Sequence, residues 1–100
     1  MKGFITDFNK AFESRIRLGI MSILVVNESV DFATLKNQLQ VTDGNMASHL
    51  SALEKLNYVE VRKQFIGRKP NTSYAVTAEG RQAFASHLDA LEKLISRRDA

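Results

Sequence analysis

Residues 43–76 read DGNMASHLSALEKLNYVEVRKQFIGRKPNTSYAV, and within this stretch the spacing of the apolar side chains changes. In the first half, apolar residues recur every three or four positions, which predicts a helix over 43–56 with one face against the core. That face comprises Met46, Leu50, Leu53 and Leu56. From residue 58 the period is two, which predicts an antiparallel pair of strands over 58–76.

The basic charge of the chain concentrates in these two strands and the turn between them. Residues 66–71, Ile-Gly-Arg-Lys-Pro-Asn, have the composition of a hairpin tip. The 100-residue chain holds 14 basic and 11 acidic residues, a formal net charge of +3. Residues 58–76 account for all of this excess, because they hold one acid against four basic residues. These are Glu60 and then Arg62, Lys63, Arg68 and Lys69.

Upstream of residue 43, the pattern predicts a short helix over 33–40, after a one-residue bridge strand within residues 30–32. Residues 40–41 form a tight break, and either Thr42 or Asp43 caps the next helix. Two helices joined by a tight turn form a helix-turn-helix unit. The basic hairpin that follows this unit is a wing.

The outer segments are also expected to be helical. Phenylalanines spaced by four mark one helix face near the N-terminus, and Ser14 can cap a second helix, so 4–26 holds either two helices or one bent helix. Thr77 can cap a last helix over 78–97. The apolar residues of these segments are Phe4, Phe8 and Phe12, then Phe84, Leu88, Leu91 and Ile95.

The expected fold class is therefore α+β, mainly helical with a small β-hairpin, in one domain over 1–100. Its parts are the N-terminal helices (4–26), the helix-turn-helix (33–40 and 43–56), the wing (58–76) and the C-terminal helix (78–97). With no cysteine, the chain can form neither a disulfide nor a thiolate metal site. No apolar run is long enough to cross a bilayer and no secretory signal is present, so a cytoplasmic location is expected.

Catalytic motifs are absent from the sequence: it shows no paired catalytic carboxylates, no Ser-His-acid order and no phosphate-binding glycine loop. We therefore expect no enzymatic activity, no cofactor and no bound metal.

Three segments resemble winged helix-turn-helix bacterial transcriptional regulators of the MarR/ArsR-like group, in particular their small stand-alone variety. Residues 44–59 resemble the recognition helix and first wing strand, 74–81 the second wing strand and following helix, and 14–21 the opening of the first core helix. Asn57 stands where the group usually has glycine, and both residues accept a left-handed backbone. The metal-sensing branch uses cysteines or clustered histidines and acids, and this chain offers only His87 and Asp89 on its last helix.

The resemblance implies a DNA-binding surface. A recognition helix lies in the major groove, where Asn can read adenine and Ser can bond bases or phosphates. The free N–H groups at the helix start can bind a phosphate, and basic wing residues can pair with the backbone or enter the minor groove. The candidate residues are Thr42, Gly44, Asn45, Ser48, His49, Ser51, Lys55, Lys63, Arg68 and Lys69.

Each candidate also has a plain structural explanation. The polar helix face is what any exposed helix shows, and the basic wing can serve to prevent edge pairing. His49 either contacts DNA or bonds a backbone carbonyl. Arg15 and Arg17 either reach the DNA backbone or stay in solvent or between helices.

The same resemblance implies a homodimer formed by both terminal segments, through Phe4, Phe8, Phe12, Phe84, Leu88, Leu91 and Ile95. The alternative is that these residues pack on each other within one chain. The expected function is a sequence-specific regulator, a dimeric repressor that binds double-stranded DNA at a pseudo-palindromic operator. The alternative is a winged helix that binds another protein. An acidic wing would favour this alternative, whereas the wing of this chain is basic. The resemblance identifies no small-molecule effector.

Overall fold

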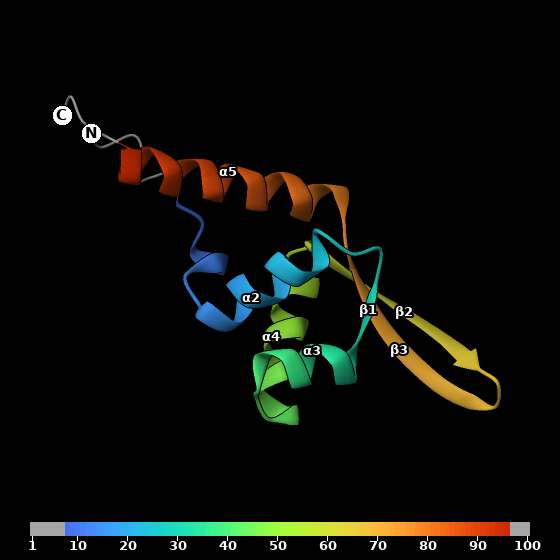
Figure 1. The fold of residues 1–100 in the computed structure, drawn as a ribbon. Coiled ribbons are helices and arrows are strands. Elements are labelled where there is room, and N and C mark those ends of the chain that lie inside the picture. Colours follow the sequence, from blue (N-terminus) through green and yellow to red (C-terminus); the bar gives the residue numbers. More distant parts are fainter. Residues whose placement is uncertain (1–7, 97–100) are drawn as a thin grey trace.

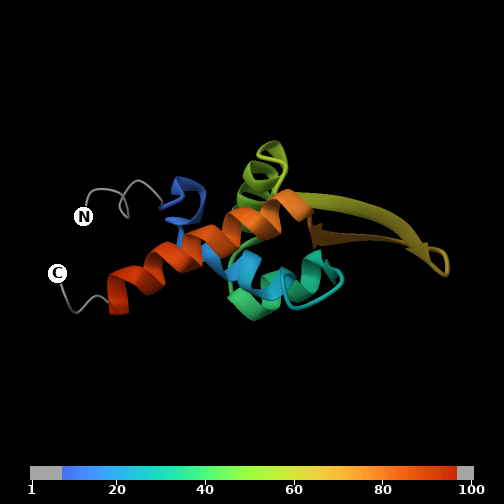
Figure 2. The ribbon, with the colours of Figure 1, turned by 90° about the horizontal axis from the view of Figure 1, so that it is seen from above.

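The computed structural model describes residues 8–96, in which a cluster of helices supports a projecting β-hairpin (Figure 1). The elements are η1 (Lys10–Phe12), α2 (Arg15–Leu24), β1 (Val30–Asp31), α3 (Phe32–Leu39), α4 (Asp43–Lys55), β2 (Val59–Ile66), β3 (Lys69–Val76) and α5 (Ala78–Ser96). The predicted α+β class and the helix-turn-helix followed by a wing are confirmed. Seen from above, α5 crosses the helical cluster and the wing extends beyond it (Figure 2). Among the described residues, no helix is long and apolar enough to span a membrane.

Hydroxyl side chains set the first residue of the principal helices. Ser14 Oγ accepts the amide of Arg17 at the start of α2, at 3.3 Å. Thr42 Oγ1 accepts an amide at the start of α4 at 3.1 Å, and Thr77 Oγ1 does so at the start of α5 at 2.8 Å. Thr42 is thus the cap of α4, while Asp43 is its first residue.

The N-terminal segment forms two elements rather than one bent helix. The 3-10 turn η1 is capped by Asn9, and α2 begins three residues after η1 ends and stops at Leu24. The expected helical face of Phe4, Phe8 and Phe12 is not formed over the described residues, since Phe8 precedes η1; Phe4 lies outside them. Helix α3 begins one residue earlier than predicted and ends at Leu39, because Gln40 adopts a left-handed backbone (φ 54°).

The wing is the major part of a three-stranded antiparallel sheet with the order β1-β3-β2. β1 spans two residues rather than one, and Val30 pairs with Tyr74 of β3. The hairpin tip is shorter than predicted, because Phe65 still pairs with Pro70 and Ile66 with Lys69. Only Gly67 and Arg68 form the turn, and Gly67 adopts the positive φ (66°) that primed hairpin turns need at their first central position.

The core joins the inner faces of α2, α3, α4 and α5 to the base of the wing. Its largest fully buried side chains are Phe12, Ile20, Met21, Leu24, Leu35, Met46, Leu50 and Leu53. Leu56, predicted to continue the buried stripe of α4, is 44% exposed. It caps the C-terminal end of α4, and the left-handed Asn57 (φ 63°) then turns the chain so that Val59 enters the core instead.

Candidate nucleic-acid interface

The outer face of α4 is polar and open. Met46, Leu50 and Leu53 are buried, and they thereby orient the opposite side of the helix toward solvent. The residues predicted to contact DNA there are all exposed except His49: Thr42, Gly44, Asn45, Ser48, Ser51 and Lys55. Within the described chain, the side chains of Asn45, Ser48 and Ser51 make no internal hydrogen bond. Their donors and acceptors are therefore free for a ligand.

His49 is half-buried and links two helices. Its Nδ1 accepts a hydrogen bond from Nε of Arg17 on α2, at 3.1 Å. Nδ1 therefore carries no proton, and in the neutral ring the proton lies on Nε2. Burial first, and then the positive charge of Arg17, lower the pKa of His49. The partner of His49 is the guanidinium of Arg17, not the backbone carbonyl that was one of its two expected alternatives. For Arg17, the same bond shows the interhelical alternative.

The start of α4 carries one neutralised acid. Asp43 Oδ1 lies 2.8 Å from Nζ of Lys36 on α3. The ion pair offsets the negative charge that would repel a phosphate from the N-terminal amides of the helix. At Gly44 no atom lies within 4 Å of where a Cβ would stand, so the backbone at this end of α4 is accessible.

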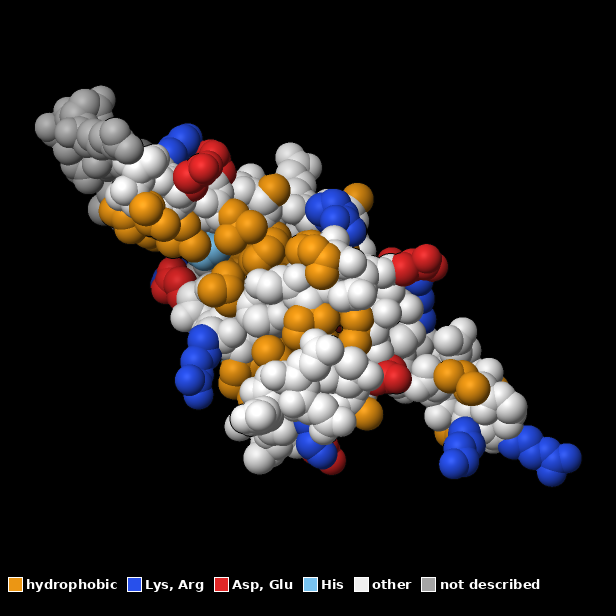
Figure 3. All heavy atoms as spheres, viewed as in Figure 1, with side chains coloured by type: hydrophobic (Ala, Val, Ile, Leu, Met, Phe, Trp, Pro, Cys, Tyr) orange, Lys and Arg blue, Asp and Glu red, His pale blue; other side chains and the backbone are white. Residues whose placement is uncertain are grey.

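The wing supplies unpaired cations. Every residue from 62 to 70 is exposed, and Lys63, Arg68 and Lys69 form no ion pair within residues 8–96. Arg62 differs, because its Nε lies 3.8 Å from a carboxylate oxygen of Glu60. Basic side chains gather at the end of the hairpin (Figure 3). The wing, α3 and α4 extend away from α5 (Figure 1).

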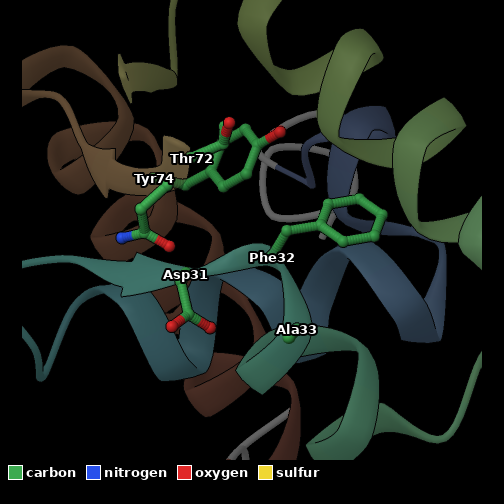
Figure 4. A pocket seen from close by; sticks show the side chains of 6 residues that line it. Asp31, Phe32, Ala33, Thr72 and Tyr74 are labelled. Atoms are coloured by element: carbon green, nitrogen blue, oxygen red, sulfur yellow. The ribbon is translucent and has the colours of Figure 1, made fainter. Parts of the chain in front are cut away.

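A hollow of about 420 Å³ lies where the wing meets the start of α3 (Figure 4). Its lining comprises Asp31, Phe32, Ala33, Asn71, Thr72 and Tyr74. Asp31 Oδ1 accepts the amide of Thr34 at 2.8 Å, and the hydrogen bonds with Thr34 lower the pKa of this carboxyl group. An ionised carboxylate disfavours phosphate, so this hollow does not extend the basic surface. A second hollow, of about 330 Å³, lies between the start of α2, including the exposed Arg15, and the turn after α3.

The residues predicted for a dimer interface separate into two groups. Phe12 and Phe84 are buried, with ring centroids 5.4 Å apart, so they serve the core of one chain, as the alternative prediction held. Phe8 lies against His87 at 5.9 Å between centroids. His87 is itself buried, and its Nδ1 accepts the amide of Asn9 at 3.0 Å.

Further along α5 the apolar side chains are open. Leu88 is 44% exposed and Ile95 82%, and Leu91 is half-buried. Leu94 is also exposed. The sequence did not predict it as part of the interface, because it lies off the regular seam of Phe84, Leu88, Leu91 and Ile95. Figure 3 shows apolar side chains gathered along and beneath α5. The described residues hold no group of three or more His, Cys, Asp or Glu side chains placed to share a metal ion.

Comparison with known proteins places this geometry in a family. Residues 16–95 match the family described as winged helix DNA-binding domain. An uncharacterized protein of Methanocaldococcus jannaschii is 37% identical over 79 residues, which cover 79% of this chain and 86% of that protein.

Solved structures show the same fold. The structure of a transcriptional regulator homologue from Pyrococcus horikoshii OT3 superimposes with a TM-score of 0.85 at 27% identity, covering 99% of this chain and 96% of the other. The transcriptional regulator BldR from Sulfolobus solfataricus superimposes with a TM-score of 0.72 at 21% identity, covering 94% of this chain and 70% of the other. The fold of this chain is thus that of solved transcriptional regulators.

Proposed function

The chain belongs to the winged helix DNA-binding domain family, and from this premise we propose that it is a transcriptional regulator that binds double-stranded DNA sequence-specifically. The observation that carries the proposal is the pairing of two surfaces. Within residues 8–96, the outer face of α4 offers polar side chains that make no internal hydrogen bond, and the adjacent wing offers cations that form no ion pair. An interface that reads bases and neutralises phosphates needs both.

In this proposal α4 occupies the major groove. Asn45, Ser48 and Ser51 face the base edges, where an amide can form a bidentate pair with adenine. Thr42 and Gly44 bring the N-terminal amides of α4 to a phosphate. Lys55, near the other end of α4, contacts the backbone. His49, through its free Nε2–H, donates to a base or a phosphate while Nδ1 remains bonded to Arg17.

The wing holds the duplex through its charge. Lys63, Arg68 and Lys69 pair with phosphates, a contact that carries no sequence information by itself but sets the register of α4. Because each neutralised phosphate releases counterions, binding depends steeply on salt. With a net charge of only +3, we expect modest affinity for one subunit.

A homodimer would supply the missing affinity. Leu88, Leu91 and Ile95, together with Leu94, form the open apolar surface along α5, which we assign to a two-fold interface with a second copy. Two α4 helices would then reach successive major grooves of a pseudo-palindromic operator. Occupation of such a site within a promoter excludes the transcription machinery, so repression is the proposed outcome.

The test is a gel shift with DNA from upstream of the protein's own gene, against random DNA of the same length, over a salt series. We expect a preference for the upstream DNA and a steep loss of binding as salt rises. Absence of binding above that of random DNA at low salt would contradict the proposal and favour a winged helix that binds protein.

Base reading by α4 is tested by Asn45→Ala, with Gln82→Ala on the exposed side of α5 as control. We expect Asn45→Ala to weaken the free energy of DNA binding by about 1–3 kcal/mol, because the amide that pairs with one base is lost. The preference for that base should be relaxed. Binding to a panel of single-base variants of the upstream site measures this. An unchanged base preference would mean that Asn45 does not contact the bases.

A further inference from the structure

The tip of the wing carries two large apolar side chains that the described part of the chain leaves exposed. Phe65 is 73% exposed and Ile66 63%, although Val59 on the same strand is buried. Among residues 8–96, the other strongly exposed large apolar residues are either on α5, where a partner copy is proposed, or isolated, as is Val26 (77% exposed) in the loop after α2. Phe65 and Ile66 are adjacent and belong to the last two paired positions before the turn of the hairpin. Apolar side chains are visible near the end of the projecting hairpin (Figure 3). The side chains of Phe65 and Ile66 are here called the tip pair.

The backbone holds the tip pair in place. Phe65 pairs with Pro70 and Ile66 with Lys69, and the turn beyond them has only two residues. Because side chains alternate along a strand, Phe65 lies on the face of the ribbon that also bears Pro70, and Ile66 lies on the opposite face. The end of the ribbon is thus apolar on both faces. It is an ordered projection rather than a loose loop, since the strand pairing continues to the turn.

The charge around the tip pair indicates the chemistry of its partner. Residues 61–76 contain four basic residues and no acidic one. Lys63, Arg68 and Lys69 lie within three residues of the tip pair along the chain, and none of them has an ion-pair partner among the described residues. An apolar tip flanked by cations complements a partner that offers apolar surface close to anionic groups. Double-stranded DNA offers both, because the stacked faces of its bases are apolar and lie between two rows of phosphates, while the base edges that line its grooves are polar.

We propose that the tip pair acts as a wedge in the minor groove, an inference that rests on the DNA-binding function proposed above. Lys63, Arg68 and Lys69 hold the bordering phosphates, while Phe65 and Ile66 press against one base step and partly unstack it. Apolar wedges of this kind bend DNA by tens of degrees toward the major groove. Pyrimidine–purine steps, such as TA, unstack with the least cost, so the wedge selects such a step without any polar contact to it.

The experiment compares three full-length proteins: the wild type, Phe65→Ser with Ile66→Ser, and Val26→Ser as a control of matched exposure outside the wing. The probe is the duplex enriched by the wild type from a random-sequence library. Energy transfer between dyes at the duplex ends reports bending. Adenines of the flanking steps are replaced in turn by 2-aminopurine, whose fluorescence rises on unstacking.

For the wild type and Val26→Ser, we expect a bent duplex and a fluorescence rise at one step. For the double variant we expect a straight duplex, no rise, and affinity lower by about tenfold, with the slope of affinity against salt unchanged because no cation is lost. A library selected with the double variant should lose the preference for a pyrimidine–purine step at that position.

Four outcomes would overturn the wedge. The wedge is wrong if the wild type binds the duplex without bending it or raising the fluorescence. It is also wrong if the double variant bends the duplex equally. In both cases the proposed DNA binding is unaffected. If sedimentation shows that the double variant alone dissociates into monomers, the tip pair contacts a second copy. If no duplex is enriched and no gel shift occurs at low salt, the proposed function fails, and the wedge fails with it.

Discussion

Two glycines of the chain differ in what a methyl group would meet. A Cβ at Gly80 would clash with the carbonyl oxygen of Tyr58, because the first turn of α5 packs directly on the backbone that leads into β2. At Gly44, by contrast, the space is open. Helix propensity alone ranks both positions as equal candidates for replacement by alanine. The close approach at Gly80 is therefore a property of the fold rather than of the helix.

We expect Gly80→Ala to lower the free energy of unfolding by about 2–4 kcal/mol, since backbone rather than a flexible side chain must move. Gly44→Ala should change it by less than about 1 kcal/mol, and toward greater stability, because alanine is the better helix former. Urea denaturation of both variants measures this. Equal effects of the two substitutions would show that α5 can shift away from the Tyr58 carbonyl at little cost in stability.

The bond between Arg17 and His49 predicts a dependence of stability on pH. The pKa of His49 in the folded protein is below the ordinary histidine value of 6.5, so the unfolded chain takes up the proton first as pH falls. The free energy of unfolding that His49 contributes is therefore complete above this value and decreases as pH falls below it. In His49→Gln the amide oxygen can still accept from Arg17 but does not titrate. Urea denaturation between about pH 8 and pH 5 should show a smaller decrease for the variant. Identical pH profiles would mean that His49 does not contribute to the pH dependence.

At the scale of elements, the salt dependence of DNA affinity distinguishes the contribution of the wing from that of α4. We expect Arg68→Ala to weaken binding to specific and random DNA alike and to reduce the slope of log affinity against log salt by about 0.9, the value for one phosphate contact. Arg68→Lys, which keeps the charge, should keep most of the slope. Filter binding over a salt series measures both. A change in sequence preference with an unchanged slope would place Arg68 among the base-reading residues.

Most element boundaries were predictable because local chemistry sets them. The hydroxyl caps Ser14 and Thr77 were predicted from sequence, as was the left-handed Asn57 after α4. The tip of the wing was not, since the residues of 66–71 suit a longer turn. Cross-strand pairing of Ile66 with Lys69 decided its length, and such pairing depends on how the two strands meet.

At the scale of the whole molecule, the exposed apolar side chains toward the end of α5 predict association with a second copy of the chain. We expect Leu88→Glu with Ile95→Glu to shift the protein from dimer to monomer and to lower its affinity for the upstream DNA by at least about tenfold, because buried charges would oppose the interface. Val26→Glu adds a charge at an equally exposed apolar site away from α5 and should leave the dimer intact. Sedimentation velocity distinguishes the two. A wild-type protein that sediments as a monomer at micromolar concentration would contradict the assignment.

Which side chains form the candidate site was partly predictable. The period of the apolar residues determined the outer face of α4, because burial of Met46, Leu50 and Leu53 leaves only one side for the rest. The position of the unpaired basic residues followed from their concentration in one hairpin. The partner of His49 could not be found in this way. Arg17 is on another helix, and only the packing of α2 on α4 brings the two side chains together.

The sequence by itself determined the order and type of the elements, the helix caps and the outward face of α4, because these depend on contacts between residues near one another in the chain. The tertiary structure alone decided which apolar residues the core takes up. It buried Phe12 against Phe84 and left Leu88, Ile95, Phe65 and Ile66 exposed. Hydrophobic spacing is the same for a residue that meets its own chain and one that meets a partner. The two are distinguished only when distant segments have packed and the remaining surface can be seen.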